Sequence, residues 1–316
     1  MLSAAKHKIL EEISASFTRQ ELIWAHGFIS GALARQGESV LQALPAEKKL
    51  SATPDERNNT YSGQVISAIN LNDIGSAKET HHIEILAEDA LYEPGDAISF
   101  IEENGYAGDT PQCYLIASSP EAHSGELHIT VPGHGLALQE GASVKFRIHK
   151  NEQFRLPDDE KDLIMIGPGA GIAPFRSFLA QRDAVGASGR NWLFFSEQNF
   201  VSDFLYQTEL QNWVETGSLT KLNVAFADDH EEGFSLSDAL FRQGPSLVEW
   251  LKNGAFLYIC AGEAALAEEI NNTLATLLTI HLRQSETEAL AYLEELKSDG
   301  RYRIESPASA PLMLVA

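Results

Sequence analysis

The feature that most constrains this chain is an apolar run that leads directly into a glycine-rich loop. Residues 163–166 read Leu-Ile-Met-Ile, and Gly167, Gly169 and Gly171 follow at alternate positions before a helical stretch with Pro174 in its first turn. A Pro is tolerated there because the N–H that it lacks has no helical partner. The pattern predicts a strand, a loop and a helix whose backbone N–H groups and dipole attract phosphate. A tight turn without any ligand produces the same local pattern.

The sequence on the two sides of this loop differs in character. From residue 157 to 316, apolar strands alternate with helical stretches, which is typical of a doubly wound parallel sheet. From 63 to 156, short β-rich runs separated by Gly, Pro, Asn and Asp turns indicate a small antiparallel β-barrel. The expected fold class is therefore α/β plus all-β. The expected strands are 64–69, 82–86, 97–101, 112–117, 126–131 and 143–148 in the barrel, and 163–166, 191–195, 219–225 and 255–260 in the parallel sheet.

The N-terminal part of the chain carries a third pattern. Apolar residues recur at helical spacing over residues 3–36, with a break at 14–18, which predicts a helical hairpin within residues 1–44. Residues 45–62 are rich in Pro, Ser, Thr, Asn and charged residues and show no periodicity, which is the composition of a linker.

Composition and charge limit the classes of function. The 316 residues include 45 acidic and 23 basic side chains, a net charge of −22, so a nucleic-acid-binding surface is not expected. The sequence shows neither an apolar run that would cross a bilayer nor a signal peptide, and we expect a cytoplasmic protein without a membrane anchor. Cys113 and Cys260 stand in no metal-ligand spacing, and the adjacent pair His81–His82 is more typical of a surface, so no metal site is expected.

Three blocks in order carry a family resemblance. Residues 167–176 read GPGAGIAPFR, and Asn191-Trp-Leu-Phe-Phe195 and Asp203-Phe-Leu-Tyr-Gln207 follow. These blocks resemble the pyridine-nucleotide domain of the ferredoxin-NADP reductase superfamily. The resemblance implies cofactor contacts at the loop residues Gly167, Gly169, Gly171, Ile172, Ala173 and Pro174.

Within that superfamily the chain looks most like the flavoprotein subunit of NADPH-sulfite reductase. Segments 17–24 and 27–31 resemble the stretch that precedes the flavodoxin-like domain of that family, and the flavodoxin-like domain itself is missing. Tyr92-Glu-Pro-Gly-Asp96 resembles the start of the flavin barrel, and the next matching block, 114–119, follows after only about twenty residues, so the connecting domain is missing too.

The resemblance implies FAD on the barrel, with departures that weaken its binding. The expected contacts are Tyr114, which would stack on the flavin, with Ile116, Ala117, Ser118, Thr130 and His134. The family's phosphate-binding Arg is replaced by Gln112, which removes a charge-assisted contact worth roughly 1.5–3 kcal/mol. The family's second phosphate loop is replaced by the short segment 131–136. FAD is therefore expected to bind weakly or differently.

The nucleotide side departs from the family as well. By resemblance, the positions that grip the 2′-phosphate of NADPH in the family correspond here to Ala227, Asp228, Gly233, Ser235 and Ser237. Residues 227–233 read Ala-Asp-Asp-His-Glu-Glu-Gly and place four carboxylates there. Each close pair of like charges costs about 1 kcal/mol or more. We therefore expect NADPH to be an unlikely ligand, whereas NADH, which lacks that phosphate, remains compatible.

Two residues occupy the family's catalytic positions. By resemblance, Cys260 corresponds to the Cys near the hydride-transfer point, and Glu305 stands where the family has a C-terminal Asp. A small buried residue at the end of a core strand explains Cys260 equally well. An apolar tail, residues 308–316, follows.

Two hypotheses on function follow. The first is a flavin-dependent oxidoreductase that transfers hydride from a nicotinamide to FAD, with altered nicotinamide binding. The alternative is a degenerate, non-catalytic reductase scaffold that acts as a binding or assembly protein. A protein partner would meet the helices in 3–36 or the acidic surface, and self-association into a homo-oligomer stays open.

Overall fold

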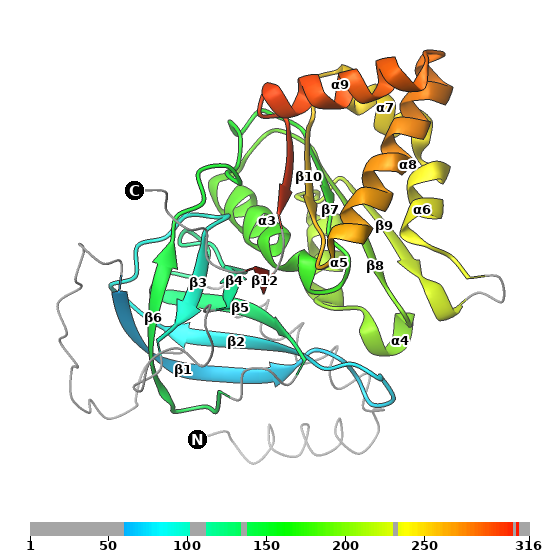
Figure 1. Cartoon of the computed structure of the whole chain (residues 1–316). Helices are drawn as coiled ribbons and strands as arrows, with labels where there is room; N and C mark the ends of the chain where they lie inside the picture. Colours follow the sequence, from blue (N-terminus) through cyan, green and yellow to red (C-terminus); the bar gives the residue numbers. More distant parts are fainter. Residues whose placement is uncertain (1–59, 102–111, 134–137, 230–232, 306–307, 310–316) are drawn as a thin grey trace, which may run out of the picture. The chain divides into compact units, whose positions relative to one another are not determined.

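The computed structural model describes residues 60–101, 112–133, 138–229, 233–305 and 308–309 (Figure 1). The predicted helical hairpin, most of the predicted linker and the predicted cofactor contact His134 lie outside these residues. The barrel and the α/β domain described below belong to one compact unit.

The first domain is the predicted antiparallel barrel. Its seven-stranded sheet has the order β12-β4-β3-β6-β1-β2-β5. An isolated bridge between Ile116 and Ile129, with the Ala117 N–H donating to the His128 carbonyl at 2.8 Å, joins the β4 end of the sheet to β5. The strands are β1 (Thr60–Asn70), β2 (Thr80–Leu86), β3 (Ala97–Phe100), β4 (Cys113–Leu115), β5 (Glu126–Pro132), β6 (Ser143–His149) and β12 (Ala308–Ser309).

Two boundaries differ from the sequence prediction. Strand β1 begins at Thr60, inside the predicted linker, because Tyr61 is buried and pairs with Phe146 of β6. Strand β12 belongs to the barrel sheet although it lies in the segment assigned to the nucleotide domain: Ala308 pairs with Tyr114 and Ser309 with Cys113. Residues 308–309 thus return to the barrel.

The second domain is the predicted doubly wound α/β domain. Its parallel sheet has the order β11-β10-β7-β8-β9, with helices on both faces (Figure 1). The strands are β7 (Leu163–Ile166), β8 (Asn191–Glu197), β9 (Lys221–Phe226), β10 (Phe256–Cys260) and β11 (Tyr302–Glu305). The helices are η1 (Gly169–Ile172), α3 (Ala173–Val185), α4 (Phe200–Asp203), α5 (Gln207–Thr216), η2 (Ala227–Asp229), α6 (Leu236–Arg242), α7 (Gly244–Lys252), α8 (Ala264–Leu282) and α9 (Glu286–Ser298).

The cores of this domain lie on the two faces of the parallel sheet. Trp192, Phe194 and Phe195 of β8 are fully buried and belong to these cores. Since side chains alternate along a strand, Trp192 and Phe194 pack against α6, α7 and α8, and Phe195 packs on the face that α3 and α5 cover.

A carboxylate of the second domain receives hydrogen bonds from the first. Asp203 accepts from Asn72 Nδ2 at 2.9 Å and from Ser76 Oγ at 2.5 Å, both in the connection between β1 and β2. It also accepts from the Asn199 N–H at 3.0 Å. Burial opposes the ionisation of Asp203, but the hydrogen bonds outweigh it and lower the pKa of this carboxyl.

Within the described residues, no helix combines the length and the apolar character that a membrane span requires.

Candidate functional site

The glycine loop forms the predicted strand, loop and helix, and its glycines have different roles. A Cβ atom at Gly171 would lie 1.9 Å from the Cys260 carbonyl oxygen, and one at Gly167 would lie 2.6 Å from the Phe175 ring. These two glycines therefore allow the loop to pack against β10 and α3. Gly169 instead has φ +54°, a left-handed conformation that favours Gly. No side chain caps the start of η1, so its first N–H groups have no side-chain partner.

An open cavity of about 670 Å³ lies against this loop. Pro168, Gly169 and Ala170 line one side, and Gly262 and Glu263, which precede α8, line another. The N-terminus of α8 carries a partial positive charge that favours an anion. The volume and the helix ends fit the pyrophosphate and one end of a dinucleotide.

The side chains around the cavity are acidic. Among the described lining residues, Lys78 has the one basic side chain, and its Nζ lies 2.6 Å from Glu197 Oε2. Carboxylates of Glu79, Glu263 and Glu269 also line the cavity. The lining therefore favours a ligand with few negative charges.

The positions that grip a 2′-phosphate in the family are occupied differently here. Ser235 caps α6, and its Oγ lies 2.7 Å from an Asp238 oxygen. The Ser237 hydroxyl donates to Glu269 Oε1 at 2.8 Å. Asp228, at another of these positions, is exposed in η2, whereas residues 230–232 lie outside the described part. Both hydroxyls are already bonded to carboxylates, and the surroundings repel a doubly charged group.

The residues predicted to hold FAD are covered by the protein itself. Tyr114 is 3% exposed, lies in the barrel core and donates its OH to Gln112 Oε1 at 3.0 Å. The other predicted contacts with the flavin that the structure describes, Ile116, Ala117, Ser118 and Thr130, are each at most 1% exposed. In this arrangement the Tyr114 ring offers no face for stacking, so these residues do not fit a bound FAD.

Cys260 and Glu305 are brought together as neighbours on β10 and β11, where they pair in register. The Cys260 side chain is fully buried, and burial, with a contribution from Glu305, raises the pKa of this thiol well above its usual value. Glu305 accepts from Asn151 Nδ2 at 2.7 Å. Burial, and then Glu305, also raises the pKa of Cys113 on β4, to about 11. The catalytic role of Cys260 and Glu305 stays a prediction.

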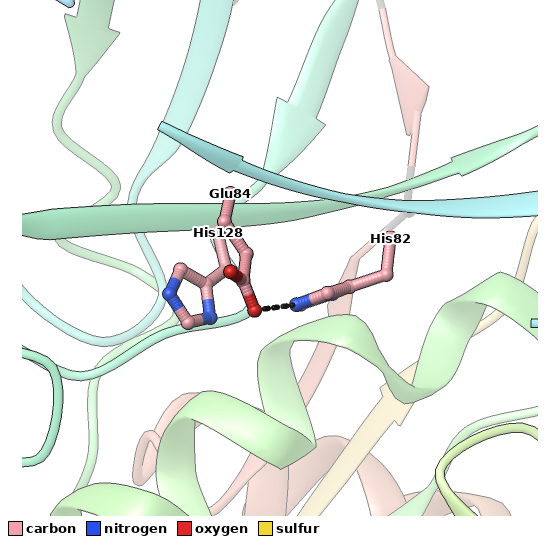
Figure 2. Close-up of side chains that lie close together, drawn as sticks. All are labelled: His82, Glu84 and His128. Atoms are coloured by element: carbon pink, nitrogen blue, oxygen red, sulfur yellow. Dashed lines mark hydrogen bonds and ion pairs between the residues drawn. The ribbon is translucent and has the colours of Figure 1, made fainter. Parts of the chain in front are cut away.

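The structure also shows a dense polar cluster that the sequence analysis did not predict. On the outer face of the barrel, β2 contributes His82 and Glu84, and β5 contributes Glu126 and His128. Figure 2 shows His82, Glu84 and His128 with their polar atoms converging, and their ligand atoms all lie within 4.8 Å of one another. His82 is 3% exposed, so the expectation that the His81–His82 pair belongs to a surface fails for this residue.

The α/β domain closes over this cluster with a buried arginine. Arg176 of α3 pairs with Glu209 through Nε to Oε2 at 2.7 Å and Nη2 to Oε1 at 3.0 Å. Its Nη1 donates to the Ala117 carbonyl at 2.9 Å and lies 3.2 Å from His128 Nδ1. The last residue of the glycine-loop block is thus an anchor between the two domains.

The comparisons with known proteins agree with this geometry. Residues 165–272 match the oxidoreductase NAD-binding domain. This part of the chain is therefore similar to the NAD-binding domain of oxidoreductases. The chain is 28% identical over 401 aligned positions to the sulfite reductase [NADPH] flavoprotein alpha-component of Bacillus subtilis (strain 168), with 89% of this chain and 66% of the relative covered. The corresponding proteins of Serratia proteamaculans (strain 568) and Shewanella sp. (strain MR-7) are 39% and 40% identical, with 61% of this chain and 35% of each relative covered.

The match to the oxidoreductase NAD-binding domain and these relatives confirm the predicted family resemblance. The chain spans less than two thirds of the length of these relatives. The Bacillus alignment extends over 401 positions although the chain has 316 residues, so that relative contains segments that have no counterpart here. The relatives are named as NADPH flavoproteins, which supports a flavin-dependent reductase family and gives no support to the prediction that NADPH is an unlikely ligand.

Proposed function

We propose that this chain is a reductase-type module that binds a nicotinamide dinucleotide, NADH in preference to NADPH, in the cavity beside Gly169. The observation that carries the proposal is the open cavity itself, which is bounded by the glycine loop and by the N-terminus of α8. The backbone N–H groups of the glycine loop and of the α8 N-terminus would hold the pyrophosphate. The NAD-binding domain extends over both.

The preference for NADH rests on the charge around the cavity. Ser235 and Ser237 are bonded to the carboxylates of Asp238 and Glu269, and Asp228 is a third carboxylate among the positions that grip the 2′-phosphate in the family. Arg242 is a basic residue near these positions, since its guanidinium stacks 4.0 Å from the ring centroid of Phe234, which lines the cavity. Three carboxylates against one guanidinium leave an environment that repels the extra phosphate.

A second candidate function, a non-catalytic binding or assembly scaffold, is favoured by one observation. Every predicted flavin contact that the structure describes is buried by the chain itself. A module in this conformation binds a nucleotide without passing hydride to flavin.

The visible spectrum of the purified full chain separates the two functions. An oxidoreductase retains or takes up FAD near one equivalent, and added NADH bleaches the flavin band anaerobically. A scaffold stays colourless after incubation with FAD. If the colourless protein still binds NADH, the proposed dinucleotide site is supported and the flavin-dependent activity is refuted.

A further inference from the structure

The polar cluster on the outer face of the barrel has the composition of a metal site. On neighbouring strands, Glu84 of β2 lies directly opposite His128 of β5, and His82 lies two residues before Glu84 on the same face. We propose that His82, Glu84 and His128 bind a divalent transition-metal ion, with Zn²⁺ as the preferred metal. Two imidazole nitrogens and one carboxylate oxygen, with an open fourth position, are a ligand set that Zn²⁺ accepts.

The distances are close to those of such a site without a metal. His82 Nε2 lies 3.2 Å from Glu84 Oε1, about the separation of two ligand atoms around a tetrahedral Zn²⁺ with bonds of about 2.0–2.2 Å. The ligand atoms of all three residues lie within 4.8 Å of one another. Figure 2 shows a His128 ring nitrogen close to the same Glu84 oxygen that bonds to His82. Small side-chain rotations bring the three atoms onto one ion.

The hydrogen-bond partners orient both imidazoles for this task. His128 Nε2 lies 3.1 Å from Glu126 Oε2, and since a carboxylate only accepts, this nitrogen carries the proton and Nδ1 keeps its lone pair. His82 Nδ1 lies 2.9 Å from the Tyr206 hydroxyl, which is in turn 2.7 Å from Thr130 Oγ1. When a metal replaces the proton between His82 and Glu84, Nδ1–H donates to Tyr206. Such outer partners are typical of histidine ligands.

The charge of the cluster favours a divalent cation. The carboxylates of Glu84, Glu126 and Glu209 lie in or beside the cluster, and Arg176 supplies the guanidinium that pairs with Glu209. Three acidic side chains against one guanidinium attract a cation.

Arg176 is the group that opposes a metal here. Its Nη1 contacts His128 Nδ1, the atom that would bind the metal. When the metal takes this nitrogen, Arg176 keeps its contacts with Glu209 and with the Ala117 carbonyl. Access comes from the carboxylate side, because the side chains of Glu84 and Glu126 are 30% and 32% exposed. A water molecule entering there completes a four-coordinate ion. The ligands belong to the barrel and the outer partners Tyr206 and Arg176 to the α/β domain, so the ion would brace the packing of the two.

The test uses Co²⁺ as a visible probe of the full chain after treatment with a chelator. We expect one equivalent of Co²⁺ to bind with the absorption of a four-coordinate site and to be displaced by Zn²⁺. Glu84→Gln keeps the size of the side chain and should weaken the Co²⁺ affinity at least about tenfold. The matched control is His81→Ala, since His81 neighbours the site on β2, is 28% exposed and is not a ligand. Its affinity should equal that of the wild type.

Thermal unfolding provides the second readout. Zn²⁺ should raise the melting temperature of the wild type and of His81→Ala but not that of Glu84→Gln. If the His128→Gln variant folds, it tests the ligand that β5 supplies. If it does not fold, Glu84→Gln alone decides the proposal, because Glu84 is partly exposed and its substitution is expected to leave the fold intact. Absence of a saturable Co²⁺ spectrum, or equal Co²⁺ affinity for the wild type and Glu84→Gln, would overturn the proposal.

Discussion

The close packing of the glycine loop against β10 makes Gly171→Ala a demanding test of the site. The added Cβ would lie 1.9 Å from the Cys260 carbonyl oxygen, whereas ordinary contact begins at 3.4 Å, so η1 and β10 must separate by about 1.5 Å. Because both sides of the clash are backbone, no rotamer change relieves it. Overpacking of this kind costs typically 1–3 kcal/mol, and we expect a loss of about 3 kcal/mol in the free energy of unfolding. The displaced loop should also weaken NADH binding at least about tenfold, a loss of about 1.4 kcal/mol.

Urea unfolding and calorimetric titration with NADH measure the two effects separately. The control is Gly186→Ala at the other end of α3, where φ is +68° and a Cβ meets nothing within 4 Å. Forcing Ala into this left-handed conformation costs about 1–2 kcal/mol and leaves the cavity unchanged. Gly171→Ala with stability within about 0.5 kcal/mol of the wild type and unchanged NADH affinity would refute the account of the loop.

Three further predictions follow from named contacts. Asp228→Arg should raise NADPH affinity relative to NADH about tenfold in calorimetry, whereas Glu286→Arg, the same charge change on α9, should not. Asp203→Asn should lower the free energy of unfolding by about 1.5–3 kcal/mol at pH 7. Because the folded pKa of Asp203 is lowered, this stability is present above the unfolded value of about 3.9 and lost as the pH falls through the folded value, so urea unfolding should show the difference from the wild type closing below about pH 4. Ser285→Ala removes the capping box of α9 and should cost about 1 kcal/mol, measured by thermal unfolding, and an unchanged melting temperature would contradict the cap.

Strong periodicity made most of the fold predictable. The predicted strand 163–166 has the observed bounds, and the barrel strands differ from their predicted ranges by a few residues at their ends. The sequence signal of helix α7 is weak, because Gly244 and Pro245 suggest a break. In the structure Pro245 stands in the first turn, and Gly244 allows close packing, since a Cβ there would lie 2.7 Å from the Leu277 side chain. Strand β12 could not be predicted, because two residues carry no periodic signal.

The candidate site was only partly visible in the sequence. The glycine loop was found from its residue types, because close backbone approach requires Gly. The burial of Tyr114 could not be predicted from the sequence, since a Tyr suits both a barrel core and a flavin contact. The metal cluster did have a signal: His82 and Glu84, and Glu126 and His128, each stand two residues apart, which places each pair on one face of a strand. The pairing of the two strands, which no local pattern fixes, was needed to bring them together.

The most direct measurement of the central claim is a calorimetric titration of the full chain with NADH and with NADPH under the same salt conditions. We expect NADH to bind at one equivalent and NADPH to bind no more tightly, since carboxylates lie near the position of its extra phosphate. Tighter binding of NADPH, abolished by Arg242→Ala, would show that Arg242 grips the phosphate and would contradict the claim.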